Sequence, residues 1–151
     1  RFMFHRNFFV ALLVLAATSA IGAEGEWETN YSKALETARN QNKRVLLDFT
    51  GSDWCGPCIE LRKRVFSRPD FRAYAEKNII LVEVDYPQRK QQSAELKQQN
   101  EKLSRQYGID QKGFPTVVLL DPDGKVVREF TGYDGDTTAS LIAWIEGKAK
   151  K

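Results

Sequence analysis

The chain has 151 residues, of which 42% are hydrophobic, 28% are charged and 11% are aromatic. This length and balance suit one globular domain and exclude a disordered tail, a collagen-like fibre and a polytopic membrane protein. Its two cysteines are too few for a small disulfide-stapled fold, and its formal charge of +3 is a weak indication of an acidic partner.

The first predicted element in chain order is a secretory signal over residues 1–23. Two arginines flank a short polar start, the apolar run FFVALLVLAA follows, and small residues then lead to a cleavage site after Ala23. The run is shorter than the roughly 20 residues of a membrane span, but an uncleaved membrane anchor and a buried core helix are the alternatives. We therefore expect export, most simply to a bacterial periplasm, and membrane anchoring if the signal stays uncleaved.

Removal of this signal takes away two basic and no acidic residues, which lowers the formal charge from +3 to +1 in the mature domain, residues 24–151. The charge then no longer indicates an acidic partner. The sequence also lacks a stripe of Lys and Arg with interleaved aromatic residues, so no nucleic-acid partner is expected.

The mature chain alternates between helical and strand patterns. Apolar spacing predicts an N-terminal helix from about 30 to 41 and further helices over 57–74, 93–107 and 137–148. Short apolar runs predict strands over 45–50, 79–84, 116–120 and 125–130, the last two joined by the turn DPDG. Within 57–74 the segment SRPD is predicted to interrupt the helix. The buried face of that helix is predicted to carry Ile59, Leu61, Val65 and Phe66.

This order predicts an α/β fold with a central mixed sheet of about four strands and helices on both faces. Alternating strands and helices favour parallel pairing through right-handed crossovers. The closing hairpin then adds an antiparallel edge.

Both cysteines lie in the segment WCGPC, at the junction of the first strand and the following helix. A zinc site needs about four ligands, and the only histidine, His5, lies in the signal, so no metal is expected. A purely structural disulfide is the second possibility, but so short a loop would stabilise the fold little. A redox-active dithiol suits the position best, because a helix start stabilises the Cys55 thiolate. Cys58 would then be the resolving thiol, with Pro57 in the first helical turn.

Three segments of the chain resemble the thioredoxin family. They are LLDFTGSDWCGPC (46–58), YGIDQKGFPT (107–116) and DPDGKVVREFTGY (121–133), so the resemblance covers about residues 44–148. The segment VFSRPDF (65–71) also resembles the helix break of secreted thioredoxin-like proteins and of the C-terminal domain of the membrane protein DsbD. The resemblance implies a thioredoxin fold preceded by an extra N-terminal helix.

The resemblance also implies roles for individual residues. Cys55 would be the nucleophile, Cys58 the resolving thiol, and Asp48 the buried acid that accepts the proton of the inner thiol. Pro115 would follow a cis peptide bond and face the disulfide, whereas the alternative is an ordinary trans proline. Substrate binding would involve Trp54, Gly56, Pro57, Phe114 and Pro115. Trp54 as a core aromatic and Asp48 as a paired strand carboxylate are the structural alternatives.

Three departures from the family pattern affect these roles. Cys55 lies seven positions after Asp48, one more than in thioredoxin, because Gly51-Ser52-Asp53 lengthens the approach. The strand Ile79–Asp85 carries no lysine, whereas thioredoxin pairs its buried acid with one, so any proton relay must differ. Two extra residues within Asp110–Lys112 lengthen the segment before Pro115.

The leading hypothesis is an exported thiol:disulfide oxidoreductase that reduces protein disulfides. It needs no cofactor beyond the redox-active pair Cys55–Cys58, acts on protein thiols and disulfides as a monomer, and is recharged by a membrane electron donor of the DsbD type. The Gly-Pro dipeptide between the cysteines resembles reducing thioredoxin rather than the oxidant DsbA. The alternatives are a disulfide oxidase or isomerase, a binding module or chaperone whose partner surface is 88–106, and service to cytochrome c maturation.

Overall fold

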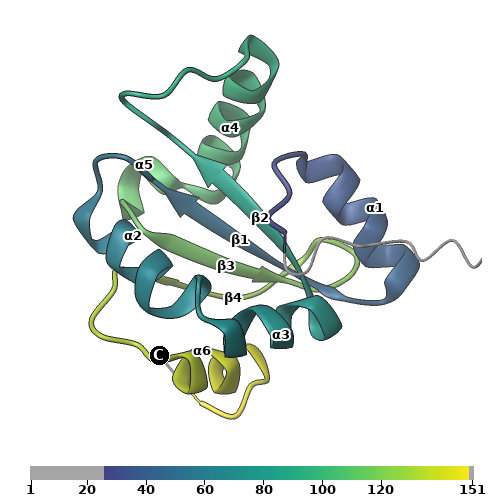
Figure 1. The fold of residues 1–151 in the computed structure, drawn as a ribbon. Coiled ribbons are helices and arrows are strands. Elements are labelled where there is room, and N and C mark those ends of the chain that lie inside the picture. Colours follow the sequence, from purple (N-terminus) through teal and green to yellow (C-terminus); the bar gives the residue numbers. More distant parts are fainter. Residues whose placement is uncertain (1–25, 150–151) are drawn as a thin grey trace, which may run out of the picture.

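The computed structural model describes residues 26–149 of the chain (Figure 1). The predicted signal over residues 1–23 lies outside the described residues. None of the helices within 26–149 is long and apolar enough to cross a membrane. The elements in chain order are α1 (Tyr31–Gln41), β1 (Arg44–Thr50), α2 (Gly56–Leu61), η1 (Arg62–Phe66), α3 (Pro69–Asn78), β2 (Ile79–Asp85), α4 (Ala94–Tyr107), α5 (Ile109–Lys112), β3 (Thr116–Leu120), β4 (Val126–Thr131) and α6 (Thr138–Ile145).

The four strands form one mixed sheet in the order β2-β1-β3-β4, which confirms the predicted α/β class. β1 runs parallel to β2, with Thr50 paired to Asp85. β3 runs antiparallel to both β1 and β4. The prediction that parallel pairing extends through the third strand is therefore wrong, since β1 and β2 form the one parallel pair in the described sheet.

The direction of β3 follows from the path of the chain between β2 and β3. β2 ends at Asp85, paired with Thr50, and β3 begins at Thr116, paired with Phe49, so both junctions lie at the same end of the sheet. The chain leaves this end through residues 86–93 and returns along α4 (Figure 1). Because the helix brings the chain back to the end it left, the next strand must run in the opposite direction.

Each face of the sheet is covered by its own hydrophobic core. On one face Leu46, Val117 and Leu119 pack with side chains from α2, η1, α3 and α6. On the other face Val45, Leu47 and Phe49 pack with α1, α4 and α5. Figure 1 shows the same division of the helices. Since side chains alternate along a strand, Asp48 and Thr50 share the face of Leu46, toward α2.

Local capping explains most of the helix boundaries. Asn30 caps α1 by accepting from the amide of Lys33, and Ser93 caps α4 by accepting from the amide of Leu96. Gly108 ends α4 in the left-handed conformation, at φ 65°. These two helices agree with the predicted 30–41 and 93–107. The last helix ends earlier than predicted, at Ile145.

The predicted helix over 57–74 corresponds to α2, η1 and α3, and α3 extends beyond it to Asn78. α2 continues into the π-turn η1, where the amide of Ser67 donates to the carbonyl of Arg62, and α3 begins at Pro69 after the predicted break. Leu61, Val65 and Phe66 are buried as predicted, but Ile59 is 41% exposed, so its place in the core is wrong. The short helix α5, which contains the two extra residues within Asp110–Lys112, is not predicted by the sequence pattern.

Candidate active site

The two cysteines lie at the start of α2 and form a disulfide with each other. Cys55 is the N-cap residue, and its sulfur accepts a hydrogen bond from the amide of Cys58 at 3.3 Å. Pro57 occupies the first turn, where its missing N–H leaves no intrahelical bond unmade. The predicted position at a helix start is therefore confirmed. An amide aimed at the Cys55 sulfur would stabilise negative charge there after reduction.

The lengthened segment between β1 and Cys55 is hydrogen-bonded to the end of β2 and to the residues that follow it. The Asp53 carboxylate accepts hydrogen bonds from the backbone amides of Gln88, Arg89 and Lys90 at 2.9, 2.8 and 3.1 Å. These bonds stabilise the ionised form and lower the pKa of Asp53. The neighbouring Ser52 hydroxyl donates to Asp85 at 2.6 Å. The loop before Cys55, which is one residue longer than in thioredoxin, is thus held by hydrogen bonds that the sequence pattern did not indicate.

Trp54 lies on the surface beside the disulfide, 38% exposed, and is not a core aromatic. Its indole N–H donates to the carbonyl of Tyr86 at 2.7 Å. Gly51 makes room for the ring, because a Cβ at that position would lie 2.4 Å from Trp54 Cε2. Gly51 is therefore part of the site architecture, whereas the sequence pattern indicated only that it lengthens the segment between Asp48 and Cys55.

Pro115 is buried, and the peptide bond between Phe114 and Pro115 is cis, as the resemblance implies. The half-buried Phe114 ring lies 5.7 Å from the ring of Trp54 and 5.2 Å from that of Tyr86, measured between centroids. The Pro115 carbonyl accepts from the amide of Gly132 at 2.8 Å. The structure thus gathers the predicted substrate-binding residues Trp54 and Phe114 into one aromatic cluster.

Asp48 is 2% exposed and lies on the face of the sheet that α2 covers. One of its oxygens, Oδ2, lies 3.8 Å from the guanidinium of Arg62. The other, Oδ1, has no hydrogen-bond partner among the described residues. Burial raises the pKa of Asp48 to about 7. The nearby Arg62 lowers this pKa, and the negative charges of Glu83 and Asp85 raise it. A buried carboxyl with this pKa can both release and accept a proton near neutral pH.

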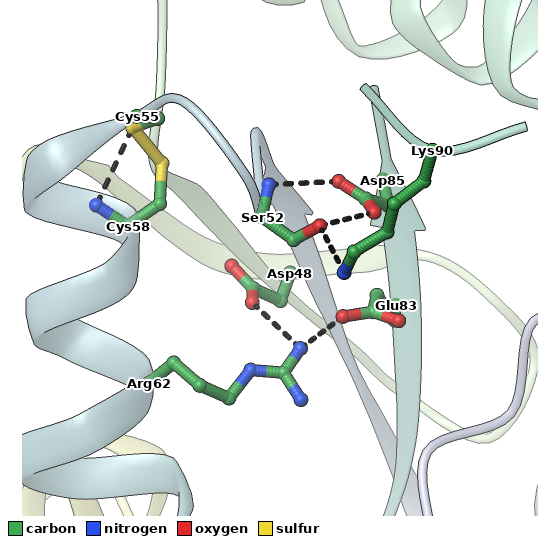
Figure 2. A network of polar contacts seen from close by, with 8 residues as sticks. All are labelled: Asp48, Ser52, Cys55, Cys58, Arg62, Glu83, Asp85 and Lys90. Carbon is green, nitrogen blue, oxygen red and sulfur yellow. Dashed lines mark hydrogen bonds and ion pairs between the residues drawn. A yellow bond between two sulfur atoms is a disulfide. The ribbon is translucent and has the colours of Figure 1, made fainter. Parts of the chain in front are cut away.

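Arg62 supplies the cation that β2 lacks. Its guanidinium forms an ion pair with Glu83, which lies opposite Asp48 in the parallel register, and Figure 2 shows it between the two carboxylates. The guanidinium also stacks on Trp27, 4.7 Å from the ring centroid. The sequence pattern did not indicate roles for Arg62, Glu83 or Trp27. The signal available in the sequence for Arg62 was its position four residues after Cys58, which places both side chains on one side of a helix.

A cleft of about 300 Å³ opens beside the inner cysteine. Its lining comprises Thr50, Ser52, Cys58, Ile59, Arg62, Lys63 and Ser67. The buried Cys58 and the partly exposed Arg62 thus border the same cleft. Among residues 26–149, no group of three or more His, Cys, Asp or Glu side chains is arranged to hold a metal ion.

Comparison with known proteins gives consistent matches. A family model described as a thioredoxin-like domain matches residues 31–146. The disulfide bond reductase DsbH of Chlamydia pneumoniae is 34% identical over 125 residues, which cover 83% of this chain and 73% of that protein. The solved structure of a DsbH oxidoreductase aligns with a TM-score of 0.74 at 32% identity, over 83% of this chain and 85% of that one. The oxidised C-terminal domain of DsbD from Neisseria meningitidis shares the fold, with a TM-score of 0.55 at 23% identity over 78% of this chain and 92% of that domain.

Proposed function

The chain belongs to the thioredoxin-like family and is a thiol:disulfide oxidoreductase, and from this premise we propose that it reduces protein disulfides outside the cytoplasm. The observation that carries the proposal is the similarity, over 83% of the chain, to a protein named as a disulfide bond reductase. The Gly-Pro dipeptide between the cysteines supports the same direction, because it resembles the strongly reducing thioredoxin.

The proposed reaction has two exchange steps. The Cys55 thiolate attacks one sulfur of a partner disulfide, the partner S–S bond breaks, and the released partner thiolate takes a proton from water. Cys58 then gives its proton to Asp48 and attacks the Cys55 sulfur, which breaks the bond between Cys55 and the partner. The second partner sulfur leaves as a thiolate. Two electrons pass from the dithiol to the partner, and the enzyme is left with the Cys55–Cys58 disulfide present in the structure.

Partner binding involves the surface around the disulfide. The exposed Trp54, Gly56 and Pro57 form one side of this surface, and the half-buried Phe114, which precedes the buried Pro115, forms the other. Because the Pro115 carbonyl already accepts from Gly132, we assign backbone pairing with an extended partner segment to Phe114. Such pairing would hold the partner's disulfide next to Cys55.

Equilibration with glutathione tests the reducing direction. The redox potential of the Cys55–Cys58 pair should lie near the value of about −270 mV that is typical of thioredoxin. A potential above about −180 mV, toward that of an oxidant such as DsbA, would replace this proposal with an oxidase or isomerase.

Insulin reduction separates the enzyme from a binding module or chaperone whose dithiol is incidental. The wild-type protein should precipitate insulin chains in the presence of dithiothreitol, and Cys55→Ser should not. Equal rates for the two proteins would show that the dithiol is not the source of the activity.

Trapping identifies the partners. In Cys58→Ser the second step cannot occur, so partner proteins should remain bound to Cys55 as mixed disulfides that mass spectrometry can identify. Recovery of many partners would support a general reductase. Recovery of a cytochrome c maturation protein alone would support a specific role in cytochrome c maturation. Recovery of none, under conditions where thioredoxin traps many, would contradict a broad reductase. A membrane electron donor of the DsbD type should be required to keep the wild-type protein reduced in cells.

Export rests on the apolar run and small residues of the predicted signal over 1–23. Mass spectrometry of the protein from cell fractions should find a periplasmic chain that begins at Glu24. A full chain in the membrane fraction would instead show an anchored protein, and a full chain in the cytoplasm would contradict export.

A further inference from the structure

We propose that Arg62 is a positioning residue of the redox centre, whose guanidinium, held by Glu83 and Trp27, controls proton exchange between the buried Asp48 carboxyl and Cys58. The inference rests on the proposed function in one respect, which is that Asp48 takes the proton of Cys58. The strand beside Asp48 carries no lysine, and the cation near this carboxyl comes from Arg62 instead.

Arg62 is held in place from three sides. Glu83 on β2 forms an ion pair with the guanidinium, and Asp48 on β1 lies 3.8 Å from it. The face of Trp27 covers it at 4.7 Å from the ring centroid. The side chain is 32% exposed, so solvent weakens these contacts only in part. A planar guanidinium can contact two carboxylates and an aromatic face at once, which the ammonium group of a lysine does less well.

Arg62 also borders the same cleft as the inner cysteine. Cys58 and Arg62 are four residues apart on the helix and both line the cleft of about 300 Å³. Figure 2 shows the Arg62 side chain extending from the helix that carries Cys58 toward Asp48. The same cation therefore lies 3.8 Å from the acid and borders the cleft that the inner cysteine also lines.

The charges around Asp48 give Arg62 and Glu83 opposite effects. The groups that face this carboxyl are Arg62 from the helix and Glu83 and Asp85 from β2, while its neighbour on β3 is the apolar Val117. Lys63 lines the adjoining cleft. Arg62 favours the ionised carboxylate that can accept the Cys58 proton, and Glu83 disfavours it. Loss of Arg62 should keep Asp48 protonated to a higher pH, and loss of the Glu83 charge should do the reverse.

Titration of the Asp48 carboxyl in the oxidised protein tests this directly, by carbon NMR, with the signal identified by its absence in Asp48→Asn. Arg62→Met should raise the midpoint by about one pH unit or more, and Glu83→Gln should lower it. Arg64→Met is the matched control, because Arg64 lies two residues away and pairs with the exposed Glu60 instead. The proposal is overturned if Arg62→Met moves the midpoint no more than the control does, or if the Arg62 and Glu83 variants move it in the same direction.

The pH profile of insulin reduction tests the consequence for turnover. A rise of about one unit from a pKa of about 7 lowers the ionised fraction at pH 7 from about one half to about one tenth, a loss of about five-fold. Arg62→Met should therefore be slower at pH 7 and recover at higher pH, and Arg62→Lys should restore part of the rate. An equal loss at all pH values would contradict a role in proton exchange. If the wild type fails to reduce insulin, the proposed function fails, but the NMR titration still decides whether Arg62 controls Asp48.

Discussion

Replacement of Asp48 by asparagine should stabilise the protein, and the gain should depend on pH. The carboxyl is buried, and one of its oxygens has no hydrogen-bond partner among the described residues. Its pKa of about 7 in the folded protein exceeds the ordinary value of 3.8. The folded state thus binds this proton more tightly than the unfolded state does. Wild-type stability should fall as the pH rises from about 4 to about 7 and stay level above that range.

The size of the effect follows from the width of this pH interval. Each pH unit between the two pKa values changes the free energy of unfolding by about 1.4 kcal/mol. An interval of about three units therefore gives about 4 kcal/mol. That is a large part of the stability of a domain of this size, about 5–15 kcal/mol. Asparagine has nearly the same shape and cannot ionise, so Asp48→Asn should avoid this loss.

Urea denaturation of the oxidised wild type and of Asp48→Asn, at one-unit steps from pH 4 to pH 8, measures the difference. The stability gained by substitution should increase with pH up to about 7 and then become constant, because the titration of groups remote from Asp48 cancels between the two proteins. Glu60→Gln is the control, since Arg64 lowers the pKa of this exposed acid and no increase toward pH 7 is expected. A difference between wild type and Asp48→Asn that does not vary from pH 4 to pH 8 would refute the reasoning.

Three further substitutions test the packing and hydrogen bonds around the site. Gly51→Ala places a Cβ about 2.4 Å from Trp54 Cε2, so the indole should move, shift its N–H resonance and slow insulin reduction; an unmoved resonance would contradict the steric argument. Asp53→Ala removes the acceptor of three amide bonds, so the amides of residues 88–90 should exchange faster with solvent at neutral pH; unchanged exchange would show that the carboxylate does not hold this segment. Phe66→Ala opens a cavity in a core position that is 1% exposed and should lower the free energy of unfolding by about 3–5 kcal/mol; a loss below about 1 kcal/mol would mean that the core closes around the gap.

The secondary structure was largely predictable because its determinants are local. The caps Asn30 and Ser93 begin α1 and α4 where the periodic apolar residues begin, and Pro69 opens α3 after the predicted break. The position of Cys55 at a helix start follows from the same local rules. Ile59 was misassigned because exposure of one helical position depends on what packs over it, and the described structure leaves it 41% exposed next to the cleft.

The sequence by itself determined the strand and helix segments, the α/β class and the redox pair, because apolar periodicity, turn residues and the spacing of the cysteines act over a few residues. Only the tertiary structure decided the direction of β3, since that depends on where the chain between Asp85 and Thr116 returns to the sheet. It alone also decided which cation serves Asp48. Arg62, the first residue of η1, reaches that acid because α2 and η1 pack across the face of β1. Electrostatic pairing depends on this distance in space rather than on position in the chain.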